Sequence, residues 1–211
     1  MLRAAIPHDE LGNALSHGLG CVLALGALPL LARAGTTTPT ALRESGLALY
    51  ALSLLSMFVV SALYHASPAG PAKQRLRRLD HAVIFLFIAG SCTPFALGRL
   101  DPLAQLPALA AVWVVALAGM LLKLAGRLRH PLLSTLLYLV FGWLAAAAAW
   151  PALGELDERA LALLVGGGLA YTLGCVFYLR GDRVRQAHFV WHLFVMLGSG
   201  LHLAAVLLAG R

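Results

Sequence analysis

Long apolar runs, each separated from the next by a short polar connection, occupy most of this chain. Each run approaches the roughly 20 residues that a helix needs to cross a bilayer, and the shorter runs need a turn from their flanks. The connections hold most of the charged residues and prolines, and nothing is left over for a soluble domain. The pattern therefore predicts a single all-α membrane domain over residues 1–211, built as a bundle of seven transmembrane helices. The seven runs are approximately Leu15–Leu31, Gly46–Tyr64, Ala82–Leu97, Leu106–Leu122, Leu132–Trp150, Ala160–Leu179 and Phe189–Ala209.

Composition agrees with a membrane protein and argues against a nucleic-acid partner. The chain is 60% hydrophobic and 12% charged, whereas a soluble domain carries about 25% charged residues. The net charge of +7 would suit nucleic acid, but the basic residues lie in short loops between apolar runs. Basic residues in such loops fix the orientation of membrane helices. We therefore expect membrane lipids, and no nucleic acid, as partners.

Lysine and arginine are divided unevenly between the two faces of the expected bundle. Eleven of them lie on the face that holds the N-terminus and the second, fourth and sixth loops, and five lie on the other face. By the positive-inside rule, this split predicts a cytoplasmic N-terminus and a C-terminus outside.

Two histidines, His188 and His192, open the last apolar run four residues apart. On a helix they project from one face, one turn apart, which is a common arrangement for binding zinc. On the expected topology His65, at the end of the second run, lies at the same end of the bundle. Three neutral imidazoles leave a fourth tetrahedral position for water, as in catalytic zinc sites. The alternative is a polar network that packs helix ends and holds no metal.

Asp80 and Ser61 are the candidate catalytic residues beside these histidines. Asp80, at the start of the third run, is the nearest carboxylate. It could act as a general base on water, or orient a ligating imidazole. Ser61 lies one turn before His65 on the same face of its helix, within reach of a water molecule or a substrate oxygen.

Further polar residues recur near the predicted site or deeper in the bundle. Glu10, Asn13 and His17 share one face of the first helix. His202 lies about 15 Å farther along the last helix than His192, so we expect it to bond a neighbouring helix or to line a cavity. His81 points roughly 100° away from Asp80 around their helix. The Gly166–Gly168 run indicates close helix packing.

At these residues the chain resembles the hemolysin III branch of the progestin and AdipoQ receptor (PAQR) family. The matching motifs occur in the family's order and cover the chain almost from end to end. They are Glu10-x-x-Asn13-x-x-x-His17-Gly18, Ser61-x-x-x-His65, Leu79-Asp80-His81, Ile88-Ala89-Gly90-Ser91-x-Thr93-Pro94-Phe95, His188-x-x-x-His192 and Gly198-Ser199-x-x-His202.

The resemblance implies a seven-helix bundle with zinc near its cytoplasmic side. By motif, the ligands are His65, His188 and His192, with Asp80 beside the zinc and Ser61 close by. The family in turn resembles the alkaline ceramidases, which implies water attack on a lipid amide or ester. Its bacterial members are associated with haemolysis and membrane lipid homeostasis, so a bacterial inner membrane is the expected location. This chain lacks the long N-terminal domain of the adiponectin receptors, so a hormone-binding role does not carry over.

Three functional hypotheses follow. The first is a zinc-dependent membrane hydrolase of lipid amides or esters, similar to a ceramidase. The second is a non-enzymatic sensor, receptor or conduit in which zinc is structural and His17 and His202 relay protons. The third is a pore-forming cytolysin, which we disfavour because a chain this hydrophobic throughout has no evident soluble form. The sequence leaves the substrate and the oligomeric state open.

Overall fold

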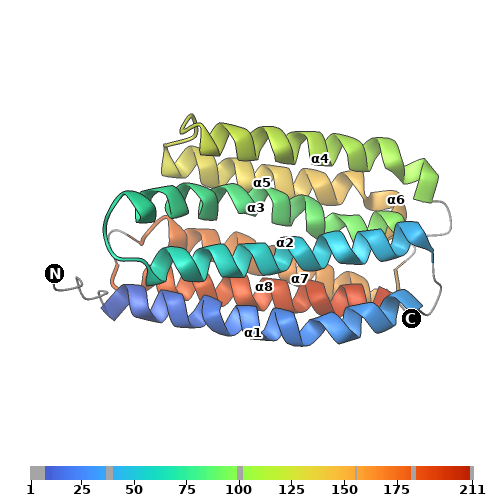
Figure 1. The fold of residues 1–211 in the computed structure, drawn as a ribbon. Coiled ribbons are helices and arrows are strands. Elements are labelled where there is room, and N and C mark those ends of the chain that lie inside the picture. Colours follow the sequence, from blue (N-terminus) through green and yellow to red (C-terminus); the bar gives the residue numbers. More distant parts are fainter. Residues whose placement is uncertain (1–7, 37–39, 99–101, 155, 182–183, 210–211) are drawn as a thin grey trace.

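The computed structural model describes the chain except for residues 1–7, 37–39, 99–101, 155, 182–183 and 210–211. Within this described part, every regular element is a helix (Figure 1). The helices are α1 (His8–Thr36), α2 (Ala41–Ala66), α3 (Pro71–Leu97), α4 (Pro102–Leu124), α5 (Pro131–Ala148), α6 (Trp150–Leu153), α7 (Glu158–Tyr178) and α8 (Ala187–Ala209).

Seven of these helices are long and apolar enough to cross a membrane, and α6 is a short helix that follows α5. The outer faces of the long helices carry many exposed leucines and valines, such as Leu15, Val114 and Leu144. Apolar side chains on the outside of a bundle suit contact with lipid tails rather than water. The prediction of a seven-helix all-α membrane protein is confirmed.

Most helices extend several residues beyond the predicted apolar runs; α1, for example, begins at His8 rather than at Leu15. α3 begins at Pro71, well before the predicted start at Ala82, because the basic segment between them is also helical. The apolar run Leu132–Trp150 is divided between two helices, since α5 ends at Ala148 and Trp150 opens α6. Hydropathy marks the part of a helix that lies in lipid, and it misses the polar turns that extend beyond it.

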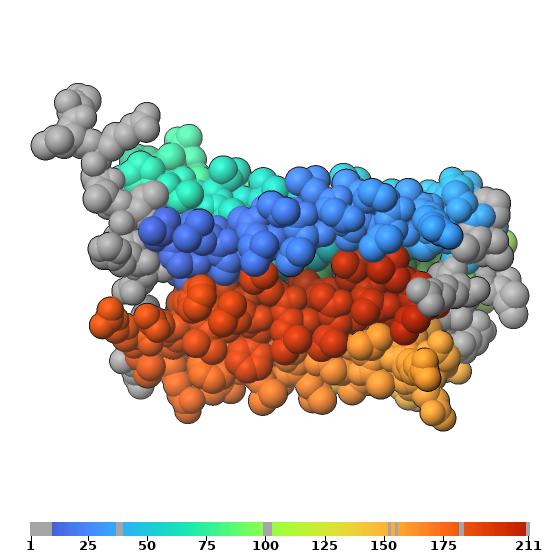
Figure 2. All heavy atoms as spheres, turned by 90° about the horizontal axis from the view of Figure 1, so that it is seen from below, coloured from blue at the N-terminus to red at the C-terminus, as the bar shows by residue number. Residues whose placement is uncertain are grey.

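Consecutive membrane-spanning helices pack against each other, as the short connections between them require. The bundle closes where α8 returns against α1, and Figure 2 shows these two helices next to each other along one face of the molecule. In Figure 1 both helices begin at the same end of the bundle, which is also the end where α2 finishes. Residues at the starts of α1 and α8 therefore meet residues at the end of α2.

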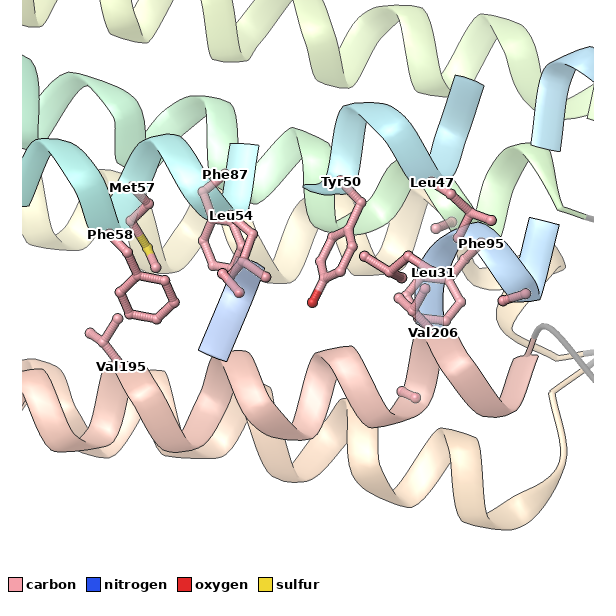
Figure 3. Close-up of a cluster of buried hydrophobic side chains, with 14 of the residues drawn as sticks. Leu31, Leu47, Tyr50, Leu54, Met57, Phe58, Phe87, Phe95, Val195 and Val206 are labelled. Carbon is pink, nitrogen blue, oxygen red and sulfur yellow. The ribbon is translucent and has the colours of Figure 1, made fainter. Parts of the chain in front are cut away.

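A buried apolar cluster joins α1, α2, α3 and α8 behind that meeting point (Figure 3). Tyr50, Phe58 and Phe95 fill much of its volume and are between 0% and 4% exposed. Close packing of such rings resists displacement of the helices that carry them. The cluster therefore holds the ends of α1, α2 and α8 in a fixed relation to one another. Its other labelled members are Leu31, Leu47, Leu54, Met57, Phe87, Val195 and Val206.

Candidate metal centre

Three histidines from two antiparallel helices meet at one end of the bundle. His65 lies at the last turn of α2, and His188 and His192 lie in the first two turns of α8. One ring nitrogen from each lies within 4.8 Å of the other two. His65 and His192 are buried, and His188 is half-buried. The structure therefore brings together the three histidines that the spacing and the resemblance selected, and the group could hold a metal ion.

The hydrogen bonding of His65 fits a metal ligand. Its Nδ1 atom lies 2.7 Å from Oε2 of Glu10. Because a carboxylate only accepts hydrogen bonds, Nδ1 carries the proton and Nε2 carries the lone pair. That Nε2 atom is buried and has no hydrogen-bond partner among the described residues. A buried, unpaired polar atom costs about 1–3 kcal/mol, and a bound metal would remove that cost.

His192 is held in the same tautomer by a different pair of residues. The Ser16 hydroxyl donates to the backbone carbonyl of Asn13 at 2.9 Å. The Ser16 oxygen is then left to accept a hydrogen bond from Nδ1 of His192, which lies 3.3 Å away. With Nδ1 donating, Nε2 of His192 keeps its lone pair for a metal.

Asp80 and Ser61 lie beside the histidine group and pair with each other. The Ser61 hydroxyl on α2 interacts with the Asp80 carboxyl group on α3. Both residues line the cavity that is also lined by His188 and His192. Glu10 is the carboxylate that accepts from His65, and both roles expected for Asp80, general base or orienting partner of a ligating imidazole, stay predictions. Asp80 is left with its carboxyl group facing the cavity next to the histidines.

The cavity extends from this polar end into the apolar interior of the bundle. Its volume is about 400 Å³, which lies within the usual range for small-molecule sites. Beyond the histidines its walls are mostly apolar, and they include Phe95, Trp150 and Leu153. A molecule with one polar group and a long apolar portion would match both parts of this space.

The other histidines noted in the sequence do not belong to the three-histidine group; they are His17, His81 and His202. The His17 ring stacks on the His192 ring with centroids 3.7 Å apart, and neither of its nitrogens has a hydrogen-bond partner among the described residues. His202 Nε2 donates to the Leu164 carbonyl at 3.1 Å, so the expected bond to a neighbouring helix is confirmed. His81 Nε2 lies 3.4 Å from the Tyr178 hydroxyl, on another part of the cavity wall.

Sequence reasoning missed two residues that contribute to the site. Ser16 bonds His192, although it precedes the noted His17 and lies one turn after Asn13. Lys73 was counted only for orientation, yet its Nζ lies 3.1 Å from the Glu10 carboxylate. The signal for Ser16 was its position on the polar face of the first helix. Lys73 gave no comparable signal, because basic residues are common in that segment.

Comparisons with known proteins agree with these observations. The family model described as "Haemolysin-III related" matches residues 6–203. The Hemolysin-3 homolog of Bacillus subtilis (strain 168) is 34% identical over 199 residues, which cover 94% of this chain and 93% of the relative. Hemolysin-3 of Bacillus cereus is 33% identical over 94% of this chain and 90% of its own length.

A more distant relative comes from animals. The monocyte to macrophage differentiation factor of Homo sapiens is 30% identical over 166 residues, which cover 75% of this chain and 67% of the relative. No solved structure matches this chain. The family match spans nearly all of the chain, and the bacterial relatives match it almost from end to end. This chain therefore belongs to the haemolysin III-related family, with a relationship to the PAQR proteins.

Proposed function

We propose that this protein is a zinc-dependent hydrolase of lipid amides or esters that acts within the membrane and contributes to lipid homeostasis. The observation that carries the proposal is the position of the three-histidine group and Asp80 at the polar end of a long apolar cavity. Three-histidine ligand sets are typical of catalytic zinc, which keeps one position open. The bacterial relatives support a bacterial inner membrane as the location.

His65, His188 and His192 would hold the zinc ion, each through one ring nitrogen. Imidazole suits zinc, and no thiolate belongs to the group. A bound zinc ion supplies Lewis acidity that polarises a carbonyl group and activates water.

The chain's own residues supply the rest of the chemistry. The Asp80 carboxylate would accept the proton of the attacking water and return it to the amine or alcohol that leaves as the amide or ester bond breaks. The Ser61 hydroxyl would hold that carboxylate in place by donating to it. The apolar walls take the acyl chain of the substrate and exclude bulk water from the reacting carbonyl. A lipid with one amide or ester group at the head of an acyl chain fits a cavity with a polar end and apolar walls.

A second candidate function is a non-enzymatic sensor or conduit with structural zinc. His17 supports it, because this buried ring stacks on His192 and both of its nitrogens lack a partner among the described residues. Structural zinc sites use four protein ligands, and His17, whose ring stacks on that of His192, is a candidate fourth. Buried histidines inside membrane bundles also mark proton pathways, and His202 would extend such a path.

The test measures zinc content and lipid hydrolysis on the same preparations, purified without chelators or a histidine tag. Wild type should carry about one zinc per chain, and His188→Ala should lose most of it, since one of three ligands is removed. Asp80→Asn should keep its zinc while hydrolysis falls by roughly 10²–10⁴, the usual contribution of general acid–base catalysis. Glu44→Gln, a matched change at an exposed carboxylate of α2, should behave as wild type.

Two results would contradict the proposal. If zinc neither copurifies nor binds when added, the metal assignment is wrong. If zinc-loaded wild type hydrolyses no member of a panel of acyl amides and esters, the hydrolase assignment is wrong and the sensor becomes the better explanation.

A further inference from the structure

We infer that residues 10–16, two turns near the start of α1, are an outer shell of the metal centre, which selects the free nitrogen of two ligands and couples metal binding to the docking of α1. The inference rests on a metal binding at the three histidines, which is part of the proposed function. It does not depend on hydrolysis or on which lipid enters the cavity.

Glu10 forms the first half of this shell. Its carboxylate oxygen lies 2.7 Å from Nδ1 of His65 and 3.1 Å from Nζ of Lys73. The Glu10 side chain is 25% exposed and that of Lys73 is 18% exposed, so both charges are largely sheltered from solvent. A carboxylate that accepts from a ligating histidine fixes the ring and raises the basicity of the other nitrogen. Glu10 therefore prepares Nε2 of His65 to bind a cation.

Lys73 holds Glu10 in this position from a third helix. Its ammonium group also donates to the Ser67 carbonyl at 3.1 Å, and it lies 5.0 Å above the Tyr64 ring. These contacts fix the lysine at the junction of α2 and α3, where it draws the Glu10 carboxylate toward the end of α2. Glu10 thus has two partners on elements other than its own.

Ser16 forms the second half of the shell, and its hydrogen bond to the Asn13 carbonyl holds it in place. Ser16 is 8% exposed, and its single proton goes to Asn13, so its oxygen can only accept from His192. Two turns of one helix therefore satisfy Nδ1 of a ligand from α2 and Nδ1 of a ligand from α8. Both contacts leave Nε2 free, and Nε2 of His65 has no other partner among the described residues.

Coupling follows from this geometry. A metal that holds His65 and His192 in one arrangement also fixes the two Nδ1 donors to which α1 is bonded. The two equilibria are therefore linked. If docking of α1 raises the affinity for the metal by some factor, binding of the metal raises the equilibrium constant for docking by the same factor. The packing of Phe189 against Gly12 adds a direct contact between the starts of α1 and α8. The start of α1 should therefore respond to whether the metal is present.

The competing explanation is that Glu10 and Ser16 only pack helix ends. In that case their removal would lower the stability of the metal-free chain and leave metal affinity unchanged. The outer-shell role predicts a change in affinity and in the electronic environment of the metal, which packing alone would not produce.

The first experiment measures zinc affinity of the full chain in detergent by competition with a chelator. Glu10→Gln and Ser16→Ala should each weaken zinc binding by about 10–100-fold, the usual effect of removing an outer-shell partner. Matched controls are Glu44→Gln and Ser45→Ala, at exposed positions of α2 away from the site. The controls should keep the wild-type affinity. Ser16→Ala is the milder change. It tests the contact of α1 with His192 even if Glu10→Gln folds poorly.

Two further measurements separate outer-shell control from packing. With cobalt in place of zinc, the visible absorption spectrum of Glu10→Gln should differ from that of wild type, because the basicity of one ligand changes. Removal of zinc from wild type should increase deuterium uptake in residues 10–17. The inference is overturned if zinc affinity and the cobalt spectrum are unchanged in both variants. It is also overturned if deuterium uptake in residues 10–17 does not change when zinc is removed.

Absent zinc binding in wild type would instead refute the metal assignment itself. That result is distinguishable from the failure of the outer shell, because the latter leaves wild-type zinc binding intact.

Discussion

Replacing Gly167 with alanine tests how closely α7 and α8 pack beside the cavity. A Cβ atom at this position would lie against the ring of His202, 2.6 Å from Nε2, and 3.0 Å from the Gly198 carbonyl oxygen. The carbonyl belongs to the α8 backbone, so it cannot move unless the helix moves. The ring can turn away only by breaking its hydrogen bond to the Leu164 carbonyl.

The magnitude follows from these opposing effects. Overpacking costs about 1–3 kcal/mol, and a buried donor that loses its acceptor costs about 1–3 kcal/mol. Alanine regains roughly 0.5–1 kcal/mol over glycine inside a helix. The net loss is about 3 kcal/mol, which for a chain of this size lowers the melting temperature by roughly 6–12 °C.

The assay is thermal unfolding in detergent, with Gly200→Ala as the matched control. Gly200 also lies in a membrane-spanning helix, but an added Cβ there meets no atom within 4 Å, so its stability should be unchanged or slightly raised. Adding His202→Ala to Gly167→Ala should restore part of the loss, because one of the two clashes disappears. Equal melting temperatures for Gly167→Ala and Gly200→Ala would refute the close packing of α7 on His202.

Two further predictions concern topology and the fourth zinc position. A reporter fused after the last residue should behave as non-cytoplasmic and one inserted near Arg77 as cytoplasmic, because of the uneven division of basic residues; a cytoplasmic C-terminal reporter would mean that the bundle is inverted. His17→Gln should leave zinc affinity unchanged, because the His17 ring stacks on His192 and is not one of the three grouped histidines. A clear loss of affinity, measured by chelator competition, would indicate a closed structural site and favour the sensor.

The sequence was sufficient to predict the seven-helix bundle and the grouping of the three histidines, because both follow from the order and spacing of the apolar runs. Seven apolar runs joined by short loops leave little freedom in how neighbouring helices pair. Once the spans alternate in direction, the end of the second and the start of the seventh must lie at the same end of the bundle. The topology alone therefore predicts that three histidines lie close together, without any knowledge of side-chain contacts: His65, His188 and His192.

The outer contacts of those histidines could not be predicted in the same way. Which carboxylate reaches His65 depends on the rotation of each helix about its own axis and on which helices become neighbours. The chain order does not state that α8 returns against α1, and this contact is what places Ser16 beside His192. Asp80 was the nearest carboxylate by topology, whereas Glu10 is the one bonded to the imidazole.

The depth of the site in the bundle connects the geometry to the proposed chemistry. His65 and His188 lie at helix ends, and the cavity runs from them toward the apolar middle of the bundle. In a bilayer, the amide or ester group of a lipid lies near the interface and its acyl chain lies in the hydrocarbon core. A substrate could thus keep both parts at their natural depth while its carbonyl reaches the histidines. Water, which the hydrolysis consumes, is available at the interface and scarce in the core. A centre at the helix ends therefore suits hydrolysis better than one at the middle of the membrane would.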